Sequence, residues 1–449
     1  MRTIGITSAL LAGLSYIDGV QAFTYRGVNA GAWLVTEPWM LGILYNDTKA
    51  VDEWHLCSML GKDQCLKTLD NHWNTFYTRD DFVDIKNAGL SMSNYPYLIR
   101  AVQWAKELGL KIFIDMHGVP GSQNGWEESG LVGPIAFLTN QTNQDRTLKV
   151  LKNLTEEFSK PEYGGTVTNI ELLNEPLYGY ADLVAFYKQG ASTMVAAGSN
   201  SSGINITVSD GFFNPHTWRN YDPWNPAATS PAKNVTVDTH QFWAFPPLTS
   251  LSGPEIIDYV CNFSQAQLKA SADLGTPPVL VGEWSLSTGV TANSTQDAYY
   301  DVAKRTFFRE LFEAQAMAFA PNAPGQPSIG WFFWSWKTEY DIDAWSYRKG
   351  VQQGYIPSNV SDFSTYEFPM RSDGCLDRNH NYTAPVLATA SGTSSSVPAI
   401  TGSNSGSNTG STTSSAASAS STKPSSATRF GVQGWVAVAS VMILSVVLA

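Results

Sequence analysis

Short apolar runs alternate with amphipathic stretches along most of the chain, from Phe23 to about Thr383. The apolar runs predict strands, and the amphipathic stretches predict helices. The predicted strands are Tyr25–Asn29, Lys111–Met116, Asn169–Leu173, Ile204–Val208, Val235–Thr239, Val279–Val281 and Gly330–Phe333. The predicted helices include Leu98–Leu108, Thr147–Phe158, Leu183–Ala197 and Asp297–Ala318.

This alternation predicts the fold class. Strands that alternate with helices imply a parallel sheet. Seven strands over roughly 360 residues fit a (β/α)8 barrel with insertions, at the upper end of the usual size of that fold. The chain has 449 residues, which is ample for a large core. We therefore expect an α/β protein whose barrel domain covers residues 23–388.

Two segments of the chain are predicted to lie outside the barrel domain, one at its start and one rich in Ser and Thr. Residues 1–22 combine a basic start, an apolar run and small residues before Phe23, which predicts a secretory signal peptide. A frayed N-terminal helix is the alternative. Residues 389–428 consist mainly of Ser, Thr, Gly and Ala, which predicts a disordered, O-glycosylated stalk.

The C-terminal residues 429–449 include an uncharged apolar run from Trp435 to Ala449. The run is shorter than the roughly 20 residues that span a bilayer, and no Lys or Arg follows it. Small residues, a short spacer and an apolar tail are typical of a GPI-attachment signal. We therefore expect a secreted protein of the cell surface or wall that meets the membrane only through a lipid anchor. A short tail-anchor helix is the alternative.

Sequons and cysteines agree with an extracellular protein. Asn-x-Ser/Thr sequons occur at Asn46, Asn140, Asn153, Asn200, Asn205, Asn234, Asn262, Asn293, Asn359 and Asn381. The four cysteines are too few for a disulfide scaffold and lack the spacing of a zinc site. Cys57 and Cys65 are close enough to pair locally, and Cys261 would then pair with Cys375.

The net charge of the chain argues against two classes of binding partner. The chain has 28 Lys and Arg against 39 Asp and Glu, for a net charge of −11. Nucleic acid favours a basic stripe, and an anionic membrane surface favours basic segments, so we expect neither as a partner. No phosphate-binding loop, dinucleotide fingerprint or Cys/His cluster is present. We therefore expect no cofactor and no metal, and we expect a monomer.

Polar and aromatic side chains follow most of the predicted strands. In a (β/α)8 barrel the chemistry sits at the carboxyl ends of the strands. The residues at or beyond these ends include Glu37, His117, Asn174, Glu175, Asp210, His240, Glu283 and Trp334. Each motif alone is weak, because Asn-Glu-Pro is a common tripeptide and a glutamate at a strand end is usually solvated. Two glutamates that each close an apolar strand, both with aromatic neighbours, are much more specific.

Glycoside hydrolysis needs such a pair of carboxyl groups. One carboxylic acid protonates the leaving oxygen, and the other, ionised, attacks the anomeric carbon. Their surroundings must hold the two pKa values apart. Tryptophan faces suit the apolar C–H faces of pyranose rings, and Asn174 beside Glu175 is placed to hold the 2-hydroxyl of the sugar.

At these motifs the chain resembles the fungal exo-β-1,3-glucanases of glycoside hydrolase family 5, subfamily 9. The resemblance covers about Tyr25 to Pro357. It is carried by YRGVNAGAWLVTEPW (25–39), DMHGVPGSQNGW (115–126), IELLNEP (170–176), VGEWS (281–285) and WFFWSWKTE (331–339). It implies a (β/α)8 barrel and a retaining mechanism.

The resemblance also implies roles for single residues. Glu175 matches the acid/base and Glu283 the nucleophile. Glu37, His117, Asn174 and His240 match glycone-binding residues, Trp334 matches the tryptophan that lines subsite −1, and Trp126 and Phe245 match an aromatic clamp at subsite +1.

Three departures from the family stand out. Relatives continue after Ala88-Gly89-Leu90 with a second strand ending in Val-Arg-Ile-Pro, whereas this chain runs directly into the next helix, so the strand and its arginine are missing. Either the transcript encodes a strand that this chain lacks, or the barrel is degenerate. Phe242 replaces a tyrosine whose hydroxyl bonds the nucleophile. Glu127-Glu128 replaces an Asp-Asn pair, which puts the linkage preference in doubt.

These features lead to one main hypothesis and two alternatives. The main hypothesis is a glucan 1,3-β-glucosidase that releases glucose from the non-reducing ends of cell-wall β-1,3-glucan and can transglycosylate. The first alternative is an endo-β-1,6-glucanase, since VGEWSLS and AWSYRKGVQQGYIP also resemble that sister group. The second is a catalytically impaired glucan-binding protein displayed on the wall, favoured by the missing arginine and by Phe242.

Overall fold

The computed structural model describes residues 25–88, 94–290, 298–320, 328–387 and 441–447. The described parts of residues 1–386 and 439–449 form one compact unit, to which the following description applies. The predicted signal peptide and Ser/Thr-rich stalk lie outside the described residues.

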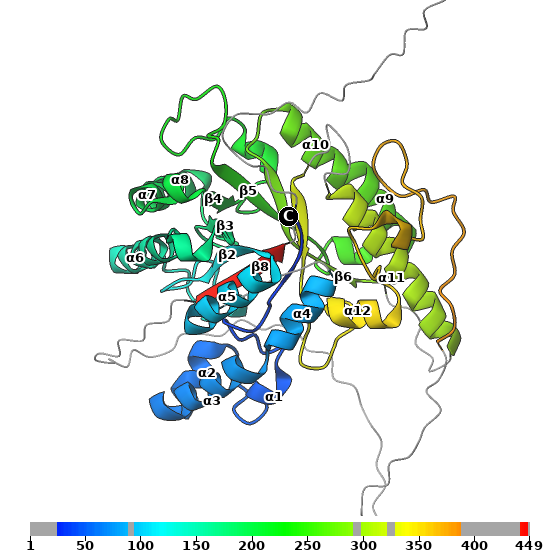
Figure 1. Ribbon diagram of the computed structural model, residues 1–449, viewed down its shortest axis with the longest axis horizontal. Helices are drawn as coiled ribbons and strands as arrows, with labels where there is room; N and C mark the ends of the chain where they lie inside the picture. Colours follow the sequence, from blue (N-terminus) through cyan, green and yellow to red (C-terminus); the bar gives the residue numbers. More distant parts are fainter. Residues whose placement is uncertain (1–24, 89–93, 291–297, 321–327, 388–440, 448–449) are drawn as a thin grey trace, which may run out of the picture. The chain divides into compact units, whose positions relative to one another are not determined.

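Eight strands and twelve α-helices make up this unit in the described ranges (Figure 1). The strands are β1 (Tyr25–Asn29), β2 (Lys111–Gly118), β3 (Val167–Glu171), β4 (Asn205–Ser209), β5 (Val235–Trp243), β6 (Val279–Thr288), β7 (Gly330–Phe333) and β8 (Val441–Val447). The helices are α1 (Gly42–Tyr45), α2 (Glu53–Leu60), α3 (Lys62–Thr75), α4 (Arg79–Ala88), α5 (Ile99–Leu108), α6 (Gln141–Phe158), α7 (Tyr180–Ala196), α8 (Ser199–Ser202), α9 (Gly253–Tyr259), α10 (Gln265–Asp273), α11 (Ala298–Ala318) and α12 (Tyr347–Gln353).

Seven parallel strands curl into a barrel wall in the order β1, β7, β6, β5, β4, β3, β2. Helices such as α5, α6 and α7 pack outside the strands, with α5 against β2, α6 against β3 and α7 against β4 (Figure 1). The predicted α/β barrel with a missing second strand is confirmed, since no parallel strand of the described chain lies between β1 and β2.

The position between β1 and β2 is filled from the far end of the chain. Strand β8 runs antiparallel to both neighbours, with Val28 opposite Val446 and Asp115 opposite Ile443, and it closes the ring. An open gap would leave the backbone N–H and C=O groups of two strand edges unpaired. These seven residues belong to the segment expected to be a GPI-attachment signal, and residues 89–93, where relatives carry the second strand, lie outside the described residues.

Several strand ends differ from their predicted positions, and three of these corrections bear on the site. Strand β5 continues past Thr239 to Trp243, and β6 continues past Val281 to Thr288. The two strands keep pairing through register shifts, with His240 opposite Glu283. Both side chains therefore stand on paired strands rather than on loops. Conversely, β3 ends at Glu171, two residues before its predicted end, so Glu175 follows on a turn.

An apolar plug fills the barrel below the site. Tyr25, Phe113, Leu280 and Phe332 form a buried cluster contributed by four different strands. Because side chains alternate along a strand, Phe113 shares the inward face of β2 with Asp115 and His117. The inward row of β2 therefore changes from apolar at the bottom of the barrel to polar near its top.

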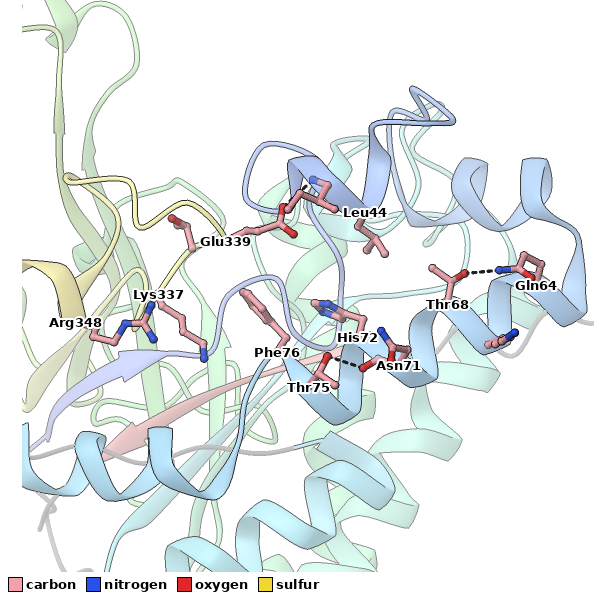
Figure 2. Close-up of a pocket in the computed structure, with 13 residues that line it drawn as sticks. Leu44, Gln64, Thr68, Asn71, His72, Thr75, Phe76, Lys337, Glu339 and Arg348 are labelled. Atoms are coloured by element: carbon pink, nitrogen blue, oxygen red, sulfur yellow. Dashed lines mark hydrogen bonds between the residues drawn. The ribbon is translucent and has the colours of Figure 1, made fainter. Parts of the chain in front are cut away.

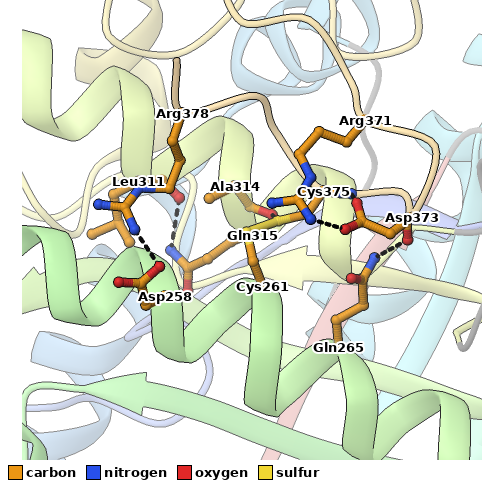
Figure 3. Close-up of a disulfide and its surroundings, with 10 residues drawn as sticks. All are labelled: Asp258, Cys261, Gln265, Leu311, Ala314, Gln315, Arg371, Asp373, Cys375 and Arg378. Carbon is orange, nitrogen blue, oxygen red and sulfur yellow. Dashed lines mark hydrogen bonds and ion pairs between the residues drawn. A yellow bond between two sulfur atoms is a disulfide. The ribbon is translucent and has the colours of Figure 1, made fainter. Parts of the chain in front are cut away.

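Both predicted disulfides are confirmed. Cys57–Cys65 joins α2 to α3, and Cys261–Cys375 joins the short turn after α9 to the segment that follows α12. Figure 3 shows the second disulfide with its neighbours, among them the ion pair between Arg378 and Asp258. This disulfide attaches the C-terminal part of the described barrel domain to the helices around β6.

Candidate active site

The two predicted catalytic glutamates face each other across a histidine. His240 Nδ1 lies 2.5 Å from Glu175 Oε1 and 3.5 Å from Glu283 Oε2. One oxygen of each carboxylate and a ring nitrogen of His240 all lie within 4.8 Å of one another. Retaining glycosidases hold their two carboxyl groups about 5–5.5 Å apart, whereas inverting enzymes need about 6.5–9.5 Å. The spacing therefore suits direct attack by one carboxylate on the sugar.

Local backbone conformation sets the orientation of the two glutamates. Glu175 has a φ of +42°, a left-handed conformation that few non-glycine residues adopt. Gly282, the residue before Glu283, donates its N–H to Asp238 Oδ1 at 2.7 Å, and a Cβ atom there would lie 2.1 Å from Asp238 Oδ2. Only glycine allows this close approach, and it fixes β6 against β5 beside the nucleophile candidate.

Three predicted glycone-binding residues carry buried polar atoms without a hydrogen-bond partner. These atoms are Oε1 of Glu37, Nε2 of His117 and both amide atoms of Asn174. Each residue is at most 3% exposed. Buried polar groups are normally paired, so this cluster is suited to a ligand rich in hydroxyl groups.

The protonation of these groups follows from burial. Burial raises the pKa of Glu37 to about 8, although a hydrogen bond from Trp39 partly opposes it. Burial lowers the pKa of His117 to about 3, so its ring is neutral at neutral pH. A neutral carboxyl and a neutral imidazole can each donate and accept hydrogen bonds, which suits sugar hydroxyls.

His240 behaves differently from His117. Burial lowers its pKa, but the carboxylates of Glu283 and Glu175 more than offset burial and raise it well above its usual value. For Glu283, burial raises the pKa well above normal, His240 lowers it, and Glu175 raises it. The imidazolium of His240 is therefore the charge that opposes the protonation of Glu283.

Aromatic rings line the site. Trp334 stacks on His117 with ring centroids 5.4 Å apart and planes within 11° of parallel. Trp126 and Phe245 are 41% and 60% exposed. Trp126 contacts Phe212 edge-on, whereas Phe245 contacts Phe242. The two residues expected to form a clamp therefore each pack on another aromatic ring, and the rings remain open to a ligand.

Sequence reasoning missed a layer of buried carboxyl groups beneath the glutamates. Asp115 bonds His117 Nδ1 at 2.8 Å, and Asp238 lies 3.5 Å from His240 Nε2. Glu171 has an oxygen without a partner, and burial raises its pKa well above normal, helped by Asp238. The signal was present as Asp-x-His on both β2 and β5, a spacing that puts both side chains on one face of a strand.

Lys and Arg are absent from the charges that act on the described carboxyl groups of this layer. For the described carboxyl groups Asp115, Glu171 and Glu283, the neighbouring charges that shift the pKa values are carboxylates and His240. This matches the missing arginine of the second strand. Within the described residues, Glu175, His240 and Glu283 also form a group close enough to bind a metal ion.

A separate pocket lies elsewhere on the barrel. Figure 2 shows a pocket of about 610 Å³ between α1, α3 and the segment after β7. Its lining includes Lys337, which pairs with Asp81 at 2.6 Å, but none of the predicted site residues. The pocket is therefore separate from the carboxylate pair.

Residues 71–339 match the family described as "Cellulase (glycosyl hydrolase family 5)", which is more than half of the chain. The chain belongs to glycoside hydrolase family 5. Membership supports reading the paired glutamates as the catalytic carboxyl groups of a glycosidase.

Curated relatives from fungi agree with this family. The chain is 32% identical over 418 aligned positions to the "Probable glucan 1,3-beta-glucosidase A" of Aspergillus fumigatus, covering 80% of this chain and 94% of the relative. It is 31% identical over 393 positions to the protein of the same name from Aspergillus niger, covering 75% and 88%.

Solved structures confirm the fold. The rutinosidase from Aspergillus niger superposes with a TM-score of 0.58 at 22% identity, covering 74% of this chain and 98% of that one. The structure described as AoRut gives a TM-score of 0.61 at 19% identity, covering 74% and 97%. At these identities the likeness concerns the fold alone.

Proposed function

We propose that this family 5 glycoside hydrolase is a retaining glucan 1,3-β-glucosidase that releases glucose from the non-reducing ends of cell-wall β-1,3-glucan. The observation that carries the proposal is the carboxylate pair around His240, within 4.8 Å, beside the unpartnered polar atoms of Glu37, His117 and Asn174. The name shared by its curated relatives supports the choice of β-1,3-glucan.

The proposed reaction has two steps. The ionised carboxylate of Glu283 attacks the anomeric carbon while the carboxyl group of Glu175 gives its proton to the glycosidic oxygen, and the leaving sugar departs. A covalent glucosyl ester on Glu283 remains. Glu175, now ionised, takes a proton from water as the water oxygen attacks the anomeric carbon and releases Glu283. A sugar hydroxyl in place of water gives transglycosylation.

Two substitutions test the roles. Glu283→Gln should abolish turnover of laminarin and leave thermal unfolding unchanged. Near-normal hydrolysis by this variant would overturn the nucleophile assignment. Glu175→Gln should lose far less activity on aryl glucosides with good leaving groups than on laminarin, because such groups need no protonation. An equal loss on both substrates would contradict the acid role.

Two alternative functions would each give a different experimental result. An endo-β-1,6-glucanase would release oligosaccharides from pustulan, whereas the proposed enzyme should release glucose from laminarin. A glucan-binding protein with impaired catalysis is favoured by Phe242 and by the lack of Lys or Arg among the charges that act on the described carboxyl layer. That protein would bind laminarin without turnover.

We also propose that the protein is secreted, glycosylated and attached to the plasma membrane by a GPI anchor. Support comes from the N-terminal pattern, the ten sequons and the apolar C-terminus. The sequon residues Asn46, Asn153 and Asn359 are exposed, as glycan acceptors must be. In the described ranges, no helix combines the length and apolar character needed to cross a bilayer.

A further inference from the structure

The pocket between α1, α3 and the segment after β7 takes no part in the proposed reaction. Its volume of about 610 Å³ falls within the range of about 300–1,000 Å³ that small-molecule sites occupy. Figure 2 shows its two sides: Thr68 and Asn71 of α3 lie on one, and Lys337, Glu339 and Arg348 lie on the other. The pocket therefore has room for a short oligosaccharide.

Two cations of the pocket are neutralised within the protein. Lys337 pairs with Asp81 at 2.6 Å. One nitrogen of Arg348 donates to both carboxylate oxygens of Asp341, at 2.9 and 2.8 Å. An anionic ligand would have to compete with these two carboxylates for the cations. The pocket is therefore poorly suited to a phosphate or carboxylate ligand.

The rest of the lining mixes hydrogen-bond donors with acceptors. Burial lowers the pKa of His72 to about 4, so its ring is neutral at neutral pH. Lys67 adds one ammonium donor, and Glu339 adds one carboxylate, of which one oxygen accepts the backbone N–H of Ile43 at 2.7 Å. The side-chain amide of Asn71 can both donate and accept. Such a mixture suits neutral hydroxyl groups, because each hydroxyl also donates and accepts.

Part of the pocket wall is apolar. His72 stacks on Phe76, with ring centroids 4.9 Å apart and planes within 26° of parallel. Ile43 and Leu44 line the pocket from α1. Pyranose rings combine hydroxyl groups with apolar C–H faces, so this wall and the polar groups around it match the two surfaces of a sugar. Phe76 also packs against the buried cluster that contains Trp334, so the pocket adjoins a wall of the candidate active site.

Two segments that lead away from the candidate active site meet at this pocket. The segment after β1 carries Glu37 and continues into α1, and the segment after β7 carries Trp334 and continues to Glu339. The backbone N–H of Glu339 donates to the backbone oxygen of Met40 at 3.1 Å, which joins the two segments. Both leave the carboxyl ends of their strands, where the chemistry of such barrels sits. A sugar chain held in the pocket would therefore lie near the carboxylate pair.

We propose that this pocket is a second sugar-binding site that takes a short stretch of a β-1,3-glucan chain. The choice of glucan rests on the proposed function, whereas the neutral, hydroxyl-rich class of ligand rests on the lining of the pocket. The site does not touch the bond that is cleaved. It holds a polymeric substrate at a second point, and two attachment points on one chain raise the apparent affinity for the polymer.

Calorimetry with laminaritriose tests the site in Glu283→Gln, a background that should bind the sugar without turnover. We expect two binding sites per chain. Adding Asn71→Trp, which fills the pocket from an exposed position of α3, should remove one of them. Asn71→Ala, which adds no bulk, should weaken that site about tenfold, the usual effect of one lost hydrogen bond.

The matched control is Leu66→Trp, which places the same ring on the same helix but outside the pocket. Leu66 is 51% exposed and is not part of the lining. This variant should keep both sites. Equal isotherms for Asn71→Trp and Leu66→Trp would overturn the proposal. So would binding of inorganic phosphate that Asn71→Trp abolishes, in the absence of any binding of laminaritriose there, since the pocket would then be an anion site.

Kinetics in the otherwise wild-type chain separate the pocket from the catalytic carboxylates. Asn71→Trp should raise the KM for polymeric laminarin about tenfold relative to Leu66→Trp, because one attachment point is lost. The kcat/KM for 4-nitrophenyl β-glucoside, which has a single sugar, should stay within about twofold. Equal losses on both substrates would show that the variant disturbs the catalytic site, and would overturn the proposal.

Failure of the proposed function gives a different pattern. If that function is wrong, wild type hydrolyses neither substrate, while laminaritriose still binds at a site that Asn71→Trp removes and Leu66→Trp keeps. If only the pocket is wrongly assigned, wild type hydrolyses laminarin, and Asn71→Trp and Leu66→Trp both match its KM.

Discussion

Phe242 stands beside the residues that set the charge of the nucleophile candidate. Its ring centroid lies 6.4 Å from that of His240 and 5.5 Å from that of Trp345. Burial and nearby carboxylates raise the pKa of Glu283, and His240 is the group that opposes them. The resemblance to the family implies a tyrosine at this position, and Phe242 lacks the hydroxyl group with which that tyrosine would donate a hydrogen bond to the carboxylate. Its ionised form is therefore harder to reach.

The substitution Phe242→Tyr should restore that donor. Glu283 must be ionised to attack, so activity rises as pH rises through its pKa. A donor to the carboxylate lowers this pKa, and the acid limb of kcat/KM should move to lower pH, with roughly tenfold higher activity below it. The measurement is the pH profile on an aryl glucoside. Phe245→Tyr is the matched control, and the same shift in both variants would contradict the account.

At this scale, part of the site could be predicted from sequence. Glu175, His240 and Glu283 were predicted because each directly follows an apolar run that predicts a strand, and barrel topology brings the ends of such strands to one side of the molecule. The contact between His240 Nδ1 and Glu175 could not be predicted, since it depends on a left-handed turn and on the register shift that places His240 opposite Glu283. Asp115 and Asp238 were missed because their function depends on burial.

At the scale of elements, the segment that follows α12 lacks a strand or α-helix of its own as far as Leu387. It is held to the barrel by Cys261–Cys375, by the hydrogen bond of Gln265 to the Asp373 backbone at 3.1 Å, and by the Arg378–Asp258 ion pair (Figure 3). This disulfide closes a loop of 114 residues, whereas Cys57–Cys65 closes one of 8.

Removing the two disulfides should therefore have unequal effects. In the chain-entropy description, a crosslink over about 100 residues restricts the unfolded state by roughly 4.7 kcal/mol, and one over about 15 residues by roughly 3 kcal/mol. The double substitution Cys261→Ser/Cys375→Ser should lower the free energy of unfolding more than Cys57→Ser/Cys65→Ser. Denaturant unfolding measures both. A larger loss for Cys57→Ser/Cys65→Ser would contradict this expectation and would show that other contacts hold the C-terminal segment to the barrel.

At the scale of the whole molecule, the sequence predicted a barrel with a strand missing but not what occupies the gap. Strand β8 comes from the far C-terminus and pairs antiparallel with β1 and β2. Patterns of apolar residues describe local structure, whereas this pairing joins residues hundreds of positions apart. The same segment was interpreted as a GPI-attachment signal, and attachment of the anchor would remove it.

Completion of the barrel by β8 and lipid anchoring therefore exclude each other in one molecule. A chain ending at Val438 lacks β8 and leaves two strand edges unpaired, so we expect a lower Tm and weaker protection of β1 and β2 in hydrogen exchange. Equal stability of both chains would contradict a structural role for β8. A transcript that encodes a Val-Arg-Ile-Pro strand between Gly89 and Tyr97 would fill the same position and release the tail.

The proposed mechanism requires that Glu283 forms a covalent glucosyl ester. The most direct measurement is intact and peptide mass spectrometry after incubation with a 2-deoxy-2-fluoro-β-glucoside that has a good leaving group, which slows the second step. The account predicts one fluoroglucosyl adduct, on the peptide that contains Glu283, and none in Glu283→Gln. An adduct on another carboxylate, or no adduct on a chain that still binds laminarin, would contradict it.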